Sequence, residues 1–250
     1  MNAMFASTVR RLLGGVLFLV AIGPAFAGSI AVNPIRVNLS ATQATSPLVV
    51  RNNGAEPSVV QLQIVSWSQQ DGKDVLVPSR DLLATPPIFT VAAGGSQTIR
   101  VGLRQRPGAT AEGSYRLILQ EVPPPPKPEF RGLQVALRLS VPVFIAPAVA
   151  PTTSLAWQAN MTSALNSPAD LKISSVNTGN AHVQVLGFKL FAGGAELPLL
   201  SPAETAYVLP GQSRAWSLRL SSAPPAGSTV RIEARTDAGD MQANIVVAGT

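Results

Sequence analysis

Residues 133–144 read LQVALRLSVPVF, and apolar side chains recur at every second position of this stretch. A period of two is typical of a β-strand, because successive side chains point to opposite faces of a sheet. Pro142 lacks the N–H that a central strand would donate, so this strand is predicted at the edge of a sheet. A long apolar edge promotes aggregation unless a partner pairs with it. The aliphatic positions are Leu133, Val135, Leu137, Leu139, Val141 and Val143.

Short apolar runs continue along the rest of the chain. From Ile30 onward, runs rich in Val, Ile and Leu are separated by clusters of Gly, Pro, Asn and Ser, and no long segment has the 3.6-residue apolar period of a helix. This pattern predicts an all-β fold made of sandwiches. The main strands are expected at 30–39, 47–51, 58–69, 97–103, 115–121 and 133–145, and then at 155–158, 171–176, 184–191, 214–220, 231–236 and 243–247.

A composition change at residues 146–153, APAVAPTT, separates two strand-rich halves and is typical of a domain linker. Two tandem β-sandwich domains are therefore predicted, at residues 28–146 and 147–250. A proline-rich stretch, VPPPPKPEFRG at 122–132, precedes the edge strand. Its prolines favour extended backbone that cannot join a ladder, which fits a stiff connection and an exposed contact loop equally well.

The N-terminus has the pattern of a cleavable secretory signal peptide. Arg10 and Arg11 precede an apolar run over 12–22, and Ala25-Phe26-Ala27 is a small-x-small cleavage site. The run is too short for a membrane anchor, which needs about twenty apolar residues, and glycines interrupt it. Residues 1–27 are therefore predicted to be removed on export, and no stable membrane insertion is expected.

Composition argues against several classes of function. The net charge of +6 comes from scattered basic residues rather than a Lys/Arg run, so no nucleic-acid binding is expected. The chain has no cysteine and a single histidine, His182, which excludes thiol catalysis and multi-histidine metal sites. His182 is expected to be an ordinary loop or strand residue, and Asp237 with Asp240 a solvated turn. We predict no enzyme activity, no catalytic residues, no metal and no cofactor.

Six short segments, in this order and spacing, resemble the PapD-like periplasmic chaperones of pilus and fimbrial assembly. Tyr115-Arg116 and the Pro142-Val143-Phe144 ending are more similar to the archaic branch, which serves spore-coat-type pili. The resemblance implies two immunoglobulin-like sandwiches with a cleft between them. The six segments are VNPIR (32–36), DLLATPP (81–87), QTIR (97–100), EVPP (121–124), LQVAL (133–137) and YVLPG (207–211).

The resemblance also implies a function. A chaperone of this family works in the periplasm, binds an incomplete pilus subunit by donor-strand complementation and delivers it to an outer-membrane usher. The last strand of its first domain lends alternate apolar side chains to the open core of the subunit. Periodicity alone is equally consistent with these side chains facing their own domain. By position, the subunit-binding residues would be Leu133, Val135, Leu137 and Leu139.

The family holds the C-terminal carboxylate of the subunit with two basic residues. Arg36 falls on the first position, but Pro142 occupies the second and has no charge. Arg116 is predicted to replace the missing cation, because an antiparallel hairpin brings the start of its strand towards the end of the edge strand. Arg138 is the alternative. The predicted carboxylate anchor is therefore Arg36 with Arg116.

A second class of function remains open from the residues alone, a secreted structural pilin or adhesin built of β-sandwiches. A pilin would be a single incomplete domain with an N-terminal donor extension. This chain instead begins its first strand a few residues after the predicted cleavage site and shows complete strand sets in both halves. The chaperone is therefore the preferred hypothesis.

Overall fold

The computed structural model describes residues 30–247, apart from 106, 126–134, 164–168 and 225–226. All regular structure in these residues is β-strand, which confirms the all-β fold class. The predicted signal peptide, residues 1–27, lies outside the described residues, and so does Leu133. No helix capable of crossing a membrane is found in the described part of the chain.

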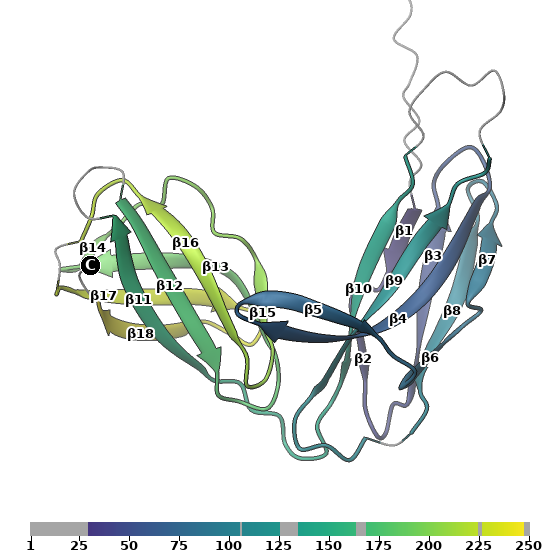
Figure 1. Cartoon of the computed structure of the whole chain (residues 1–250), viewed down its shortest axis with the longest axis horizontal. Coiled ribbons are helices and arrows are strands. Elements are labelled where there is room, and N and C mark those ends of the chain that lie inside the picture. The colour runs from purple at the N-terminus through teal and green to yellow at the C-terminus, as the bar shows by residue number, and fades with distance from the viewer. Residues whose placement is uncertain (1–29, 106, 126–134, 164–168, 225–226, 248–250) are drawn as a thin grey trace, which may run out of the picture.

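The first ten strands form a sandwich of two sheets (Figure 1). One sheet has the order β1-β3-β8-β6, and the other has the order β2-β10-β9-β4-β5, with β7 also paired to β4. Alternate aliphatic side chains of both sheets fill the space between them. The strands are β1 (Ile30–Asn33), β2 (Val37–Leu39), β3 (Thr45–Asn52), β4 (Ser58–Gln70), β5 (Lys73–Pro78), β6 (Leu82–Thr85), β7 (Ile88–Val91), β8 (Ser96–Leu103), β9 (Gly113–Val122) and β10 (Arg138–Ile145).

The remaining strands form a second sandwich. Its sheets have the orders β11-β12-β16 and β14-β13-β17-β18, and β15 also pairs with β13. Trp157, Phe188 and Trp216 meet near the centre with ring centroids 5.1–6.0 Å apart. The strands are β11 (Leu155–Ser163), β12 (Ala169–Asn177), β13 (Val183–Ala192), β14 (Ala195–Glu196), β15 (Ala206–Val208), β16 (Ser213–Leu220), β17 (Thr229–Thr236) and β18 (Met241–Val246).

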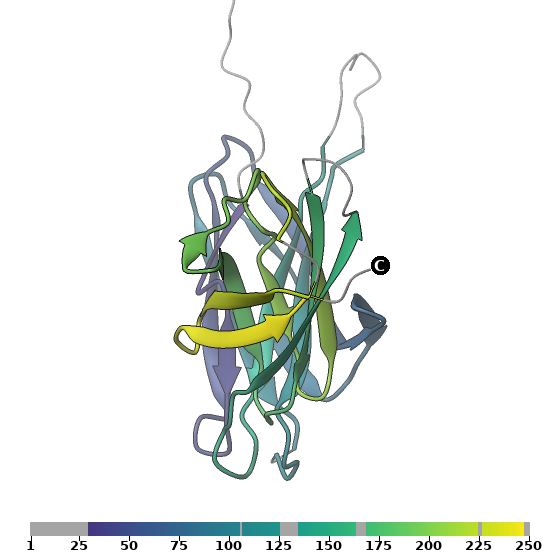
Figure 2. The ribbon, with the colours of Figure 1, turned by 90° about the vertical axis from the view of Figure 1, so that its left-hand side faces the viewer.

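The two sandwiches lie side by side and are joined at one end by the chain between β10 and β11 (Figure 1). The β4–β5 hairpin extends from the first sandwich towards the second. Figure 2 looks along the long axis, with the second sandwich in front of the first. The predicted domain boundary after Ala146 falls between β10 and β11, and its position stays a prediction.

The predicted edge position of β10 is confirmed for its first five residues. β10 pairs with β9 along its whole length, whereas β2 covers its other side only at Val143–Ile145, in parallel. Within the described residues, the outer side of Arg138–Pro142 therefore has no partner strand. The carbonyl of Leu137 accepts from the N–H of Glu121, so odd-numbered residues direct their main chain towards β9. Even-numbered residues direct theirs outward, and the N–H that Pro142 lacks would have faced this free edge.

The predicted length of this strand was wrong. β10 begins at Arg138, and Val135–Leu137 lie outside any strand. The N–H of Leu137 donates to the carboxylate of Glu121 instead of a main-chain carbonyl, so the regular ladder ends there. The alternation of apolar residues in the sequence continues past this point, although both Val135 and Ala136 are exposed.

Candidate binding site at the edge strand and the domain junction

The predicted apolar row changes its surroundings along the chain. Val141 and Val143 are buried in the core of the first sandwich, and Leu139 packs against the same core. Leu137 is half-buried, and Val135 exposes 66% of its surface. The end of the row at Val135 is therefore available to a partner, while Val141 and Val143 already contribute to the stability of their own domain.

Arg116 lies on β9 directly opposite Pro142. Its guanidinium stacks 3.7 Å above the ring of Trp67, and Nη2 lies 3.6 Å from Oδ2 of Asp74. Nη1 donates to Oγ of Ser140 at 3.4 Å. Burial leaves 17% of the side chain exposed and lowers the pKa of Arg116, although Asp74 and Tyr207 act in the opposite direction. These long contacts leave its N–H groups with weak partners.

Arg36 precedes β2 and reaches across to the second sandwich. Its Nη1 donates to Oδ2 of Asp237 at 2.6 Å. Burial lowers the pKa of Arg36, but the hydrogen bond and charge of Asp237 outweigh burial and raise the pKa overall. One predicted anchor residue is therefore already paired with a carboxylate of the same chain.

Tyr207, on β15, connects the two predicted anchor residues. Burial raises the pKa of its phenol, while the charges of Arg36 and Arg116 both act to lower it. The rings of Trp67, below Arg116, and of His182, beside Arg36, lie 5.3 and 5.6 Å from the ring of Tyr207. The structure brings Arg36 and Arg116 together around a side chain of the second sandwich. Arg138, the alternative, is exposed on β10.

His182 lies at the centre of the junction between the sandwiches. Its ring stacks on Phe144 with centroids 3.6 Å apart, and Nδ1 is 2.7 Å from Oε1 of Glu112. Nε2 is 3.5 Å from Oδ2 of Asp237 and 3.5 Å from Nη1 of Arg36. Burial lowers the pKa of His182, but the hydrogen bonds to both carboxylates raise it overall. The expectation of an ordinary histidine missed this position, because each partner is distant in sequence.

Apolar contacts and main-chain hydrogen bonds also join the sandwiches. Trp67, Phe144 and Leu209 form a buried cluster to which Tyr207 adds. The amide of Gln69, on β4, donates to the carbonyl of Tyr207 at 2.8 Å and accepts from the N–H of Leu209 at 3.1 Å. The family resemblance rests in part on Phe144 and on the segment YVLPG at 207–211, but it predicts no contact between them. The solvated turn expected at Asp237 is instead an ion-pair position.

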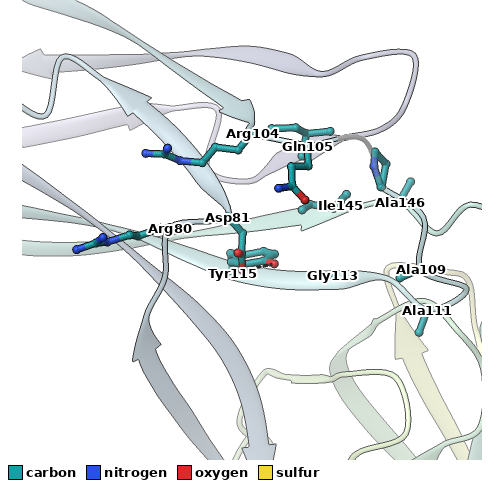
Figure 3. A pocket seen from close by; sticks show the side chains of 12 residues that line it. Arg80, Asp81, Arg104, Gln105, Ala109, Ala111, Gly113, Tyr115, Ile145 and Ala146 are labelled. Atoms are coloured by element: carbon teal, nitrogen blue, oxygen red, sulfur yellow. Dashed lines mark hydrogen bonds between the residues drawn. The ribbon is translucent and has the colours of Figure 1, made fainter.

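A separate pocket of about 260 Å³ opens in the first sandwich near the start of β9 (Figure 3). Tyr115 donates to Oδ2 of Asp81 at 3.0 Å inside it, and burial together with Asp81 raises the pKa of Tyr115 to about 12. Arg80 and Arg104 extend to one side of this pair in Figure 3. No cluster of three or more metal-ligating side chains is found among the described residues.

Parts of the chain match known proteins. The family described as "Pili and flagellar-assembly chaperone, PapD N-terminal domain" matches residues 29–151. Chaperone protein FimB/FhaD of Bordetella pertussis is 30% identical over 150 residues, which cover 55% of this chain and 60% of that protein. The match thus spans less than two thirds of this relative.

Two solved structures show the same fold over nearly all of their length. The CsuC–CsuE chaperone–tip adhesion subunit complex of archaic Csu pili, from Acinetobacter baumannii, matches with a TM-score of 0.61 and 18% identity, covering 89% of this chain and 99% of that one. The SafA pilin–SafB chaperone complex of Salmonella enterica matches with a TM-score of 0.57 and 18% identity, covering 88% and 97%. Residues 29–151 therefore match the PapD N-terminal domain of pilus-assembly chaperones, and the described chain shares the fold of the two solved structures.

Proposed function

We propose that this protein is a non-enzymatic periplasmic chaperone that binds an incomplete pilus subunit by donor-strand complementation and delivers it to an outer-membrane usher. The free edge of β10, continued by the exposed Val135, carries the proposal. A strand that pairs with this edge would meet main-chain groups from Arg138 and Ser140. The fold likeness to the chaperone of an archaic pilus supports assignment to the archaic branch.

The apolar row would supply most of the binding free energy. Leu139 already packs against its own domain, so Leu133, Val135 and Leu137 are left for the subunit. Burial of three aliphatic side chains contributes roughly 4.5 to 9 kcal/mol, at about 1.5 to 3 kcal/mol each, before the costs of association. The costs of association are of similar size, so main-chain pairing along the free edge and the carboxylate anchor must contribute as well.

Arg116 and Arg36 would fix the register by holding the C-terminal carboxylate of the subunit. A charge-assisted hydrogen bond contributes about 1.5 to 3 kcal/mol. Arg36 already bonds to Asp237 at 2.6 Å, whereas the nearest carboxylate to Arg116 is 3.6 Å away. We therefore assign the larger share of carboxylate binding to Arg116.

A charge placed in the exposed part of the row tests the proposal. Val135→Glu should abolish co-purification with a pilin-like subunit expressed beside the chaperone, because a carboxylate cannot enter an apolar subunit core without a partner. Val77→Glu, on the exposed side of β5, is the matched control and should retain the subunit. Unchanged co-purification by Val135→Glu, in a folded protein, would exclude the exposed residues before β10 as a binding surface.

A further inference from the structure

The geometry points to Glu121 as a positioning residue for the donor segment, residues 135–137, which precedes β10. Glu121 fixes the point where this segment leaves the sheet. This inference rests on the proposed function. Glu121 lies on β9 opposite Leu137, at the point where β10 begins. Its side chain takes a place in the ladder that main-chain atoms normally occupy.

The pair formed by Glu121 and Leu137 is only half regular. The N–H of Glu121 donates to the carbonyl of Leu137 at 2.9 Å, as in an ordinary antiparallel ladder. In such a pair, the N–H of Leu137 would return a bond to the carbonyl of Glu121. It donates instead to Oε2 of Glu121 at 3.1 Å.

Neighbouring side chains hold the carboxylate and satisfy the carbonyl that it replaces. The hydroxyl of Ser58, a buried residue at the start of β4, donates to Oε1 of Glu121 at 2.7 Å. The amide of Gln120 donates to the carbonyl of Glu121 at 3.1 Å. Both carboxylate oxygens and the displaced carbonyl therefore have partners, so this arrangement is a built feature and not a frayed end.

The position of this contact suits a donor segment. The N–H of Leu137 faces β9, so the carboxylate holds the segment without obstructing the outer edge of β10. Val135, two residues earlier, remains exposed. A segment held in place before binding loses less conformational entropy when a partner pairs with it. Loss of Glu121 should therefore weaken subunit binding while the sandwich stays folded.

The test compares Glu121→Ala and Glu121→Gln in the full mature chain. Amide hydrogen exchange on the protein without subunit should show protection of Leu137 falling by about tenfold in Glu121→Ala, because a hydrogen bond to a charged group is lost. Co-purification with a co-expressed pilin-like subunit should fall by a similar factor. Glu121→Gln keeps an acceptor oxygen and should stay within about threefold of the unsubstituted chain for both quantities.

Two further variants separate positioning from general stability. Ser58→Ala leaves the carboxylate in place but removes one of its donors, and should give a smaller loss in the same direction. Glu196→Ala, on the exposed strand β14, is the matched control and should change neither quantity. Amides of β9 between Leu117 and Leu119 should remain protected throughout, which reports that the sandwich is folded.

The outcomes distinguish this role from the proposed function. Unchanged exchange at Leu137 in Glu121→Ala would overturn the positioning role, and so would faster exchange with undiminished capture of the subunit. If the unsubstituted chain captures no subunit, the proposed function itself fails. Equal losses in Glu121→Ala and Glu121→Gln would also contradict the role, because rescue by an acceptor oxygen is its signature.

Discussion

The two ends of β10 lie in opposite surroundings. At Val143–Ile145 the strand is covered by β2 on one side and β9 on the other, and Phe144 is buried against Trp67, Tyr207 and His182. At Arg138–Ser140 one side is free of any strand in the described residues, and the preceding Val135 is exposed. One continuous apolar pattern in the sequence therefore fills the core at one end and leaves side chains open to a partner at the other.

The largest expected effect lies at the covered end. Phe144→Ala should lower the free energy of unfolding by about 3 to 5 kcal/mol, because an aromatic side chain that is only 2% exposed leaves a cavity between the sandwiches. Val135→Ala, at the open end, should change it by less than about 0.5 kcal/mol. Chemical denaturation measures both. Similar losses at the two positions would contradict the division of the strand.

The next effect concerns the anchor. Arg116→Ala should weaken subunit binding by roughly ten- to a hundredfold, as expected for loss of a hydrogen bond to a charged group. Arg36→Ala should have a smaller effect, since Asp237 competes for this side chain, and Arg138→Ala should be neutral. Binding of the three variants to one purified subunit, measured side by side, ranks them. Equal tolerance of all three would mean that the carboxylate is held elsewhere.

A pH dependence is expected at the covered end only. The pKa of His182 is raised above 6.5 in the folded chain, so its stabilising ion pairs are fully present below pH 6.5 and are lost as the pH rises through the folded value. The pKa of Asp237 is lowered to about 2, so this partner stays charged across that range. Thermal unfolding from pH 6 to 9 should show the loss in the unsubstituted chain. A similar slope in His182→Gln would assign the dependence to other groups.

The smallest effect tests the direction of the main chain. Pro142→Ala should change the free energy of unfolding by less than about 1 kcal/mol, because the new N–H faces the free edge. Val141→Pro, one residue earlier, removes an N–H that faces β9 and leaves a carbonyl unpaired, at a cost of at least about 1 to 3 kcal/mol. Denaturation midpoints of the two variants give the comparison. A larger loss for Pro142→Ala would invert the assigned directions.

Alternation of side chains was sufficient to predict most of the fold. The expected strands at 58–69 and 97–103 correspond to β4 (Ser58–Gln70) and β8 (Ser96–Leu103). It failed at residues 135–137, because the start of β10 is set by side chains that periodicity does not record: the carboxylate of Glu121 accepts from the N–H of Leu137, and the amide of Gln120 donates to the carbonyl of Glu121. Pattern predicts which face a side chain takes, but not which backbone atom pairs with it.

The site was less accessible to sequence reasoning. Arg36 and Arg116 were predicted as a pair, and both lie around Tyr207. Their charged neighbours were missed. Glu112, His182 and Asp237 come from segments more than fifty residues apart, and no local pattern links them. Ion pairs between domains depend on how two sandwiches pack, which no local pattern contains.

The short parallel strand β2 has a further consequence. Because it covers β10 from Val143 onward, any incoming strand must stop at Pro142, and only Arg138–Pro142, about 16 Å of edge, is open to it within β10. The open edge of β10 therefore has a fixed length that ends at Pro142. A strand paired with this edge that ran past Pro142 would collide with β2, so the edge limits how long a pairing strand can be.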